Sequence, residues 1–498
     1  METTFDEAVP ETTVHTSPNC IGMIYGDIGP TRFKCTVLAP VEKNEFIQVN
    51  HETCGMVLGR VDTIERKTDL SIEKAHLLAK GEHVEIEEMV SASIVIVGYR
   101  DERNLLQVPR TPFKAGEELE KASEDLIRKV IGLKEDRKTG AYIGMLRGHD
   151  VQIYLDINGL IQKHVSILAK TGGGKSYMAG VMLEEFLKHD VTTVVIDPHG
   201  EYSSLAQRAK SVPLGEKFRV VPNSYESKLA VFSPDTKVNP NAKSLKFTLA
   251  NLQPRDILAL TKSGSVRTHL TALREALDMI RTSRKDYDVD DILRVLEAQD
   301  DQSNFSLMNE LEYLREVDIF AREGTKIDEL VHKGMTTIIN MKGTPPDIQE
   351  LIINRVATAL FELRKMEKIP PLMMVAEEAH NFCPQQGKAA TSDIFRTIAS
   401  EGRKFGLGLM IITQRAAKVD KNVLSQCNTQ IILKVTNPND LKTIMASVEG
   451  LTAGMADEIQ MLPVGVALVT GGNISMPLLV DVRPRETEHG GKSVKILE

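Results

Sequence analysis

Apolar and polar residues alternate along the first hundred residues of the chain, in short runs separated by Gly, Asn and Pro. The segments "GMVLGRVDTI" and "HVEIEEMVSASIVIVGYR" show this alternation most clearly. A period of two is typical of strands that bury one face. The pattern predicts a small antiparallel β-barrel over residues 19–112, preceded by a polar, Thr-rich arm over residues 1–18.

The pattern changes after the predicted barrel. Leucine, isoleucine and valine at 119, 126, 127, 130 and 131 recur at helical spacing and predict an amphipathic helix over 115–133, within a linker of residues 113–140. Beyond it, uninterrupted apolar runs alternate with helical stretches, as buried parallel strands do. These runs are "HVSILAK", "VTTVVID", "MTTIINM", "PLMMVAEE" and "LGLMIITQ".

The second part of the chain is therefore predicted to be an α/β domain in two pieces, residues 141–253 and 334–482. The intervening residues 254–333 lack such strands and carry leucine-spaced, charged segments such as "THLTALREALDMI" and "DDILRVLEA". We interpret them as a helical insertion. Residues 483–498 are charged and contain glycine, and we expect them to be a tail.

Composition narrows the class of protein. The 498 residues are 42% hydrophobic and 26% charged, as in a soluble globular protein. No apolar run approaches the ~20 residues that cross a bilayer, and the start "METTFDEAVPETT" is unlike a secretory signal. A cytoplasmic protein without a membrane anchor is expected. The five cysteines form no CxxC pair, which disfavours a metal or disulfide framework.

The net charge of −8 argues against a protein that coats nucleic acid with its whole surface. Residues 396–421 nevertheless carry six basic side chains against two acidic ones. This segment is either a solvated basic face or part of a local channel for nucleic acid.

The letters GGKS occur twice, and their contexts differ. In the first copy, the strand "HVSIL" leads into the loop "AKTGGGKS", and the helix "YMAGVMLEEFLKH" follows. A glycine-rich loop between a strand and a helix binds phosphate through its amides. Lys175 would reach the β and γ phosphates, and Ser176 would bind Mg²⁺. The candidate nucleotide-binding residues are Ala169, Lys170, Thr171, Gly172, Gly173, Gly174, Lys175, Ser176 and Tyr177.

Ala169 stands where the usual first glycine of such a loop would be, and we expect the loop to tolerate it. The second copy, at 489–494, has Glu486 at that position and no apolar strand before it. We assign it to the tail. "TKID" at 325–328 resembles a GTPase motif but follows a charged helical stretch, so ATP is the expected nucleotide.

Acidic residues end two of the predicted strands. Glu377 and Glu378 follow "PLMMVA"; Glu377 would help to hold Mg²⁺, and Glu378 would polarise the attacking water. The alternative is an acidic helix N-terminus. Asp197 ends "VTTVVI" and either supports metal or water, or stabilises the turn before Pro198.

Two further residues are candidates for sensing the nucleotide. Gln414 ends "LMIIT" and would contact the γ-phosphate, unless it is a simple strand-ending amide. Arg403 would reach the nucleotide of a neighbouring subunit as an arginine finger, or it is a solvated arginine.

These motifs, taken together, resemble the HerA family of hexameric DNA translocases, in the HerA/FtsK group. The resemblance covers most of the chain, in "IGMIYGDIGPTRF", "VLGRVDTIE", "KHVSILAKTGGGKSYMAG", "VVIDPHGEY", "MVAEEAHNF", "SEGRKFGLGLMIITQRAAKVDKNVLSQCNTQIILKV" and "LPVGVALVTGG". It implies a RecA-like P-loop ATPase core behind the barrel, ATP and Mg²⁺ as ligands, and a homohexameric ring threaded by double-stranded DNA. It also implies a NurA-type nuclease partner and a role in DNA end resection for recombinational repair.

The resemblance also assigns residues. Glu378 would activate water, Glu377 would support the metal, Gln414 would be the sensor, Arg403 the finger, and Asp197 an active-site acid. Lys163 stands where the family often has an arginine, and it would supply a cation to its own subunit's nucleotide. Two other classes remain open: a secretion or conjugation ATPase that moves protein or a nucleoprotein, and a non-hydrolysing scaffold for a nuclease.

Overall fold

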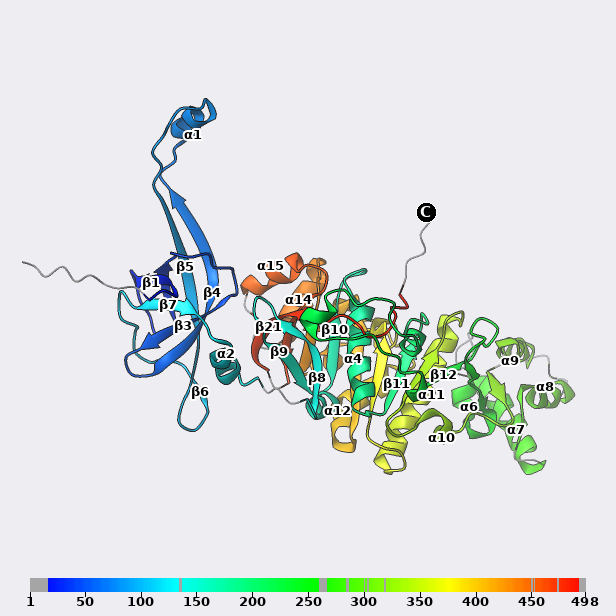
Figure 1. Cartoon of the computed structure of the whole chain (residues 1–498). Helices are drawn as coiled ribbons and strands as arrows, with labels where there is room; N and C mark the ends of the chain where they lie inside the picture. The colour runs from blue at the N-terminus through cyan, green and yellow to red at the C-terminus, as the bar shows by residue number, and fades with distance from the viewer. Residues whose placement is uncertain are drawn as a thin grey trace, which may run out of the picture. The chain divides into compact units, whose positions relative to one another are not determined.

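The computed structural model describes residues 17–133, 137–258, 267–283, 286–299, 301, 304–317, 319–448, 451, 453–472 and 474–491. These residues form two compact units, one from 17–133 with 148–151 and the other from 137–147 with 152–491 (Figure 1). Most of the predicted N-terminal arm, and the second GGKS from Lys492 onward, lie outside the described residues.

The first unit is a closed β-barrel, as predicted. Six antiparallel strands run in the order β2-β1-β7-β3-β4-β5, and β5 pairs back to β2. Short β6 pairs with the end of β5. Alternate residues bury their side chains; Phe33 and Cys35 of β2 face the core while Arg32 and Lys34 face solvent. The strands are β1 Cys20–Tyr25, β2 Arg32–Thr36, β3 Phe46–His51, β4 Gly55–Thr68, β5 Glu88–Arg100, β6 Leu106–Gln107 and β7 Glu118–Lys121.

The structure differs from the sequence prediction where the barrel closes. The helix expected over 115–133 begins only at α2 (Glu124–Ile131), because β7 occupies part of that range. Leu119 fits both a helical and a strand pattern. Pairing of β7 with β1 and β3 decides between them, since it fills the last gap in the barrel.

The hairpin of β4 and β5 extends beyond the barrel as an arm. Its strands stay paired as far as Thr68 and Glu88, and α1 (Ile72–Ala79) lies at its tip (Figure 1). Helix α1 buries none of its residues, and Ile72 is 80% exposed.

The second unit contains a twelve-stranded sheet in the order β13-β12-β16-β11-β17-β18-β10-β19-β20-β21-β8-β9. Its central strands are parallel, and β19, β20, β21, β8 and β9 are antiparallel to their successive neighbours. The bounds are β8 Gly140–Leu146, β9 Gln152–Asp156, β10 Val165–Leu168, β11 Thr193–Asp197, β12 Leu229–Ser233, β13 Lys243–Ser244, β16 Thr336–Asn340, β17 Leu372–Glu377, β18 Leu407–Thr413, β19 Thr429–Ile432, β20 Val466–Gly471 and β21 Ile474–Val482.

Every apolar run read as a parallel strand forms one, so the predicted α/β class is confirmed. Strands β10, β18 and β17 lie side by side, which places β18 between the P-loop strand and the Glu377 strand. Because all three run in the same direction, their carboxyl ends meet at one edge of the sheet. That edge carries the candidate site.

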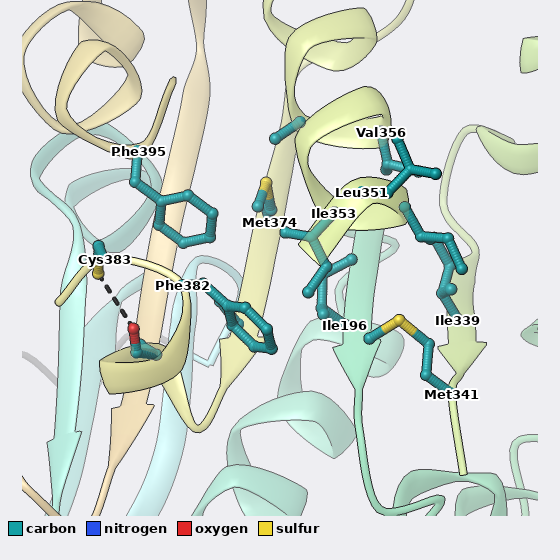
Figure 2. Close-up of a cluster of buried hydrophobic side chains, with 14 of the residues drawn as sticks. Ile196, Ile339, Met341, Leu351, Ile353, Val356, Met374, Phe382, Cys383 and Phe395 are labelled. Carbon is teal, nitrogen blue, oxygen red and sulfur yellow. Dashed lines mark hydrogen bonds between the residues drawn. The ribbon is translucent and has the colours of Figure 1, made fainter. Parts of the chain in front are cut away.

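Helices cover the sheet and bury its apolar residues. Figure 2 shows Leu351 and Ile353 of α11 close to Ile196 and Ile339 of the sheet. The helices outside the insertion are α3 Ile157–Lys163, α4 Lys175–Lys188, α5 Gly215–Phe218, α11 Pro346–Lys365, α12 Ser392–Phe405, α13 Lys421–Leu424, α14 Pro438–Ser447 and α15 Ala453–Met461.

The residues between β13 and β16 are mainly helical in the part that the structure describes. Buried leucines at the expected spacing, such as Leu273 and Leu277 of α7, pack into the same core as the sheet. The elements are β14 Phe247–Thr248, α6 Pro254–Leu258, α7 Arg267–Ser283, α8 Val289–Ala298, α9 Phe305–Val317, β15 Phe320–Ala321 and α10 Ile327–Leu330.

Candidate nucleotide-binding and catalytic site

The loop after β10 has the shape that phosphate binding requires. Gly172 and Gly174 have φ of 71° and 92°, which side-chain-bearing residues rarely adopt. A Cβ on Gly173 would lie 2.9 Å from the carbonyl oxygen of Lys170. Gly174 caps the fourteen-residue helix α4 without a side chain, so the first amides of α4 point into the loop. Such amides, at the positive end of a helix dipole, bind anions.

Ala169 fits the loop, as expected. Ala169 is buried and its φ is not positive, so this position does not need a conformation that only glycine adopts readily. The loop is anchored on both sides. The Ala169 amide donates to the Thr413 carbonyl at 3.3 Å, and the Lys170 amide donates to the Lys434 carbonyl at 2.8 Å.

Two carboxylates from the end of β17 meet the Lys-Ser pair of α4. The Ser176 hydroxyl donates to a Glu377 oxygen at 3.1 Å. The Lys175 ammonium lies 3.5 Å from the same carboxylate and donates to Glu378. The structure thus brings together four residues that the sequence analysis assigned to one site, although about 200 positions separate the two pairs.

Glu377 has the properties of a ligand for a cation. Burial raises its pKa to about 8, and the nearby Lys175 charge only partly offsets this effect. One of its oxygens is buried and has no hydrogen-bond partner in the described part of the chain. A carboxylate beside a serine hydroxyl and a phosphate loop is an oxygen set that suits Mg²⁺. Ser176 and Glu377 therefore fit the metal that the motifs imply.

Glu378 lies in an unusual backbone conformation, with φ of 51°. Its carboxylate faces His380 at 3.3 Å as well as Lys175. The imidazole of His380 is 3.0 Å from the Thr413 hydroxyl, and burial lowers the pKa of His380. A strained, non-glycine position that aims a carboxylate into a site is typical of functional residues.

Gln414 follows β18, and the position of β18 between β10 and β17 brings it to the P-loop. Its side-chain oxygen accepts a hydrogen bond from the Thr171 hydroxyl. Both residues line the cavity described below. The predicted sensor is therefore in contact with the phosphate-binding loop.

Asp197 occupies the predicted edge of the sheet but does not line the cavity. Its oxygens accept from the amides of Gly200, Glu201 and Tyr202 at 2.8, 3.2 and 3.0 Å. Burial raises its pKa to about 6 despite these hydrogen bonds. Of the two interpretations left open by the sequence, the geometry favours a turn-stabilising role, in which Asp197 positions the loop after β11.

A cavity of about 830 Å³ joins these elements. Besides the P-loop, Glu377, Glu378 and Gln414, its lining includes residues that the sequence analysis did not select: His199, Glu201, Val482, Pro484, His489 and Gly491. The "DPHGEY" segment could have indicated His199 and Glu201, because it follows a strand of the same edge. No motif in the sequence around residues 482–491 indicated that this segment would line the cavity.

Lys163 and Arg403 lie at the opposite edge of the sheet. Lys163 ends α3 directly before β10, whereas the P-loop follows β10, and four strand residues span about 13 Å. Lys163 and Arg403 line a second cavity, of about 1070 Å³, together with Lys404. The expected action of Lys163 on its own subunit's nucleotide does not fit this placement.

The basic segment 396–421 divides between the two edges of the sheet. Arg396 is neutralised by Asp420, 2.6 Å away. Arg403 and Lys404 belong to the second cavity. Arg415 and Lys418 are exposed in the segment between β18 and α13, and Lys421 is exposed at the start of α13.

The predicted tail differs most from the structure. Residues 483–487 are buried, and Arg483 is fully enclosed. Arg483 lies 2.8 Å from both Glu184 and Glu185 of α4. Charge in a segment usually indicates solvent exposure, but here each charge has a buried partner that is remote in sequence, which is why the prediction was wrong.

Comparison with known proteins identifies relatives of the whole chain. The model of the HerA helicase central domain matches residues 141–360. A probable helicase of Methanocaldococcus jannaschii is 28% identical over 95% of this chain and 92% of its own length. The DNA double-strand break repair helicase HerA of Pyrococcus furiosus is 25% identical over 96% of each chain. Among solved structures, VirB4 of Thermoanaerobacter pseudethanolicus aligns with a TM-score of 0.49 at 14% identity, over 70% of this chain and 97% of that one.

None of the helices in the described residues is both long enough and apolar enough to span a membrane.

Proposed function

The chain belongs to the HerA family of helicases, and from that premise we propose that it is an ATP-driven motor that moves along double-stranded DNA. The observation that carries the proposal is the cluster of Lys175, Ser176, Glu377 and Glu378 at the phosphate-binding loop. This cluster has the groups that ATP hydrolysis needs: a cation for phosphate, oxygen ligands for Mg²⁺ and a carboxylate for water.

The geometry suggests how nucleotide binding would prepare the site. In the structure, the Lys175 ammonium is paired with Glu378. Phosphates in the loop would attract Lys175 and release Glu378, which is then free to accept a proton from the attacking water. Ser176 and Glu377 would hold Mg²⁺, and the ion when bound would neutralise phosphate charge. Thr171 and Gln414 would contact the γ-phosphate.

A ring of subunits would complete the site. Arg403 and Lys163 lie at the sheet edge remote from their own P-loop, so their charges are available to the nucleotide of an adjacent subunit. An arginine supplied in this way stabilises the charge of the transition state. We propose a homohexamer in which each active site takes its P-loop from one subunit and these two cations from the next.

DNA would pass through the ring by contacts to its phosphates. Arg415, Lys418 and Lys421 are exposed in the segment that follows Gln414, as far as the start of α13, so a change at the γ-phosphate can be transmitted to them. Contacts of this kind carry no sequence information, and they weaken as salt rises.

A NurA-type nuclease is the proposed partner, and end resection in recombinational repair is the proposed process in which the two act together. The exposed apolar residues of the barrel arm, Ile72, Leu77 and Leu78, support docking of a protein on the barrel unit. A co-sedimentation assay with purified nuclease should show binding that Ile72→Ser with Leu77→Ser abolishes. Full binding by this double variant would show that the β4–β5 arm is not part of the interface.

The motor proposal is tested by ATP hydrolysis with and without linear duplex DNA. We expect DNA to stimulate the wild type, and Glu378→Gln and Arg403→Ala each to be inactive. A mixture of the two variants should regain part of the activity, because some interfaces then pair an intact Glu378 with an intact Arg403. Hydrolysis that is indifferent to DNA would indicate an ATPase with another cargo. DNA-dependent functions that stay intact in Glu378→Gln would favour a non-hydrolysing scaffold.

A further inference from the structure

The chain beyond β21 does not leave the molecule but crosses the P-loop helix. Arg483 donates to Glu184 and Glu185 of α4, at 2.8 Å each, and to the Tyr142 carbonyl at 2.9 Å. All three charged residues are buried. Removing one partner from such a group leaves an uncompensated buried charge, which is strongly unfavourable. The start of the segment is therefore fixed on α4.

The next residues continue the attachment. One Glu184 oxygen accepts from the amides of Glu486 and Thr487, at 3.0 Å each, and from the Thr487 hydroxyl at 2.7 Å. Glu486 in turn accepts a 2.6 Å hydrogen bond from the Tyr225 hydroxyl and pairs with Lys188. Most hydrogen-bonding groups of residues 483–487 are thus satisfied by one helix and its neighbours.

This attachment carries the end of the segment to the nucleotide cavity. The Arg485 amide donates to the Tyr177 hydroxyl at 2.8 Å, and Tyr177 directly follows Ser176. The ring centroids of His489 and Tyr177 are 5.5 Å apart, in an edge-to-face arrangement. Val482, Pro484, His489 and Gly491 all line the cavity.

Gly490 and Gly491, the glycines of the second GGKS, allow the segment to pack closely against a neighbouring loop. A Cβ on Gly490 would lie 2.1 Å from the backbone oxygen of Glu201, a distance that no side chain permits. A Cβ on Gly491 would lie 3.1 Å from a carboxylate oxygen of Glu201 and equally close to the His489 ring. The segment therefore packs against the loop that Asp197 positions.

Two chemically different sets of residues line the cavity. The P-loop amides, Lys175, Ser176 and the glutamates are suited to phosphate and metal. Much of the rest is apolar, and includes Pro213, Leu214, Phe218, Val464, Val482 and Pro484. Apolar side chains offer a phosphate group no hydrogen bond, whereas the flat face of a base buries apolar area against them.

We propose that residues 482–491, with Tyr177, form the wall that binds the nucleoside part of the nucleotide, and that the His489 ring contacts the base. This proposal deepens the proposed ATPase function and rests on it. The C-terminal segment then has a defined role, because it makes affinity depend on the base while the P-loop binds the phosphates.

Calorimetric titration with two probes separates these contributions. ATP with Mg²⁺ reports contacts to both the phosphates and the nucleoside, and inorganic tripolyphosphate with Mg²⁺ reports only contacts to the phosphates. We expect His489→Ala to weaken ATP binding about 5- to 20-fold, in the lower range for loss of a base–aromatic contact, with tripolyphosphate binding unchanged. Gly490→Val, which keeps the imidazole but displaces the segment, should behave similarly.

Matched controls make the outcome decisive. His83→Ala removes an exposed histidine in the barrel arm and should bind both probes like the wild type. Lys175→Ala should lose both probes; a wild type that binds neither would overturn the proposed ATPase function itself. If the wild type binds both probes and His489→Ala and Gly490→Val bind ATP equally well, or lose both probes equally, the nucleoside wall alone is overturned. Equal urea midpoints of all variants would exclude unfolding as the cause of any loss.

Discussion

The Ser176 hydroxyl donates a 3.1 Å hydrogen bond to Glu377, across 201 positions of sequence. This contact joins the first turn of α4 to the end of β17, which is separated from the P-loop strand β10 by β18. The Ser176 hydroxyl and the Glu377 carboxylate are the oxygen pair at which Mg²⁺ would bind.

Loss of either member of this pair should alter the metal requirement. We expect Ser176→Ala and Glu377→Gln to raise the Mg²⁺ concentration that half-saturates hydrolysis, because each removes one oxygen ligand or its partner. Titration of Mg²⁺ at saturating ATP measures the change. Glu201→Gln, which removes another carboxylate that lines the same cavity, is the control. An equal shift in that variant would show a general electrostatic effect instead of ligation.

The P-loop should tolerate glycine at position 169 but not alanine at position 173. Ala169→Gly should cost no more than roughly 0.5–1 kcal/mol of stability, the usual entropic penalty of glycine, and leave nucleotide affinity nearly unchanged. Gly173→Ala places a Cβ 2.9 Å from the Lys170 carbonyl and should distort the loop. Nucleotide binding by both variants provides the comparison, and normal binding by Gly173→Ala would contradict the geometry.

Lys163 should act on the neighbouring subunit's nucleotide. Lys163→Ala and Lys175→Ala are each expected to reduce hydrolysis, and a mixture of the two should regain part of it. In mixed rings, some interfaces combine an intact P-loop from one subunit with an intact Lys163 from the next. No recovery in the mixture would place Lys163 in its own subunit's site and contradict its position at the opposite edge of the sheet.

Affinity for duplex DNA should fall steeply with salt. Each phosphate that a basic side chain neutralises contributes about 0.9 to the slope of log affinity against log salt. Lys418→Ala and Lys421→Ala should therefore each lower the slope by about 1, without changing sequence preference. Fluorescence anisotropy from 50 to about 200 mM salt measures this effect. Lys368→Ala removes an exposed lysine outside residues 415–421 and should leave the slope unchanged.

Acid should destabilise the core through His164. Both ring nitrogens are engaged: one accepts from the Leu409 amide at 2.9 Å, and the other is 3.1 Å from the Ala399 carbonyl. Burial lowers the pKa of His164 to about 4, from an ordinary value of 6.5. The unfolded chain therefore binds a proton that the folded chain does not, and stability falls as pH drops from 6.5 towards 4.

The pH effect of His164 is isolated by substitution. Urea unfolding at several pH values should show the wild type losing on the order of 3 kcal/mol over this window. His164→Gln should be less stable at pH 7.5, but its stability should change less between pH 6.5 and 4. Parallel pH profiles for the two proteins would assign the acid sensitivity to other groups.

The local pattern of this sequence determined most of the fold and the phosphate end of the site. Apolar runs of strand length cannot be exposed, so each became a buried strand. Gly172 and Gly174 can adopt the positive φ that this loop requires, and Glu377 and Glu378 directly follow an apolar run of strand length. These features depend on near neighbours in sequence, and the sequence displays them.

The tertiary structure decided what depends on contacts between distant segments. Leu119 became part of a strand because the barrel had an edge to close. Lys163 lies away from its own P-loop because α3 ends before β10 begins, whereas the P-loop follows β10. Residues 483–491 look like a solvated tail until Arg483 meets Glu184 and Glu185, some 300 positions earlier. A charged segment is buried only where its partners are buried with it, and no local pattern can show where those partners lie.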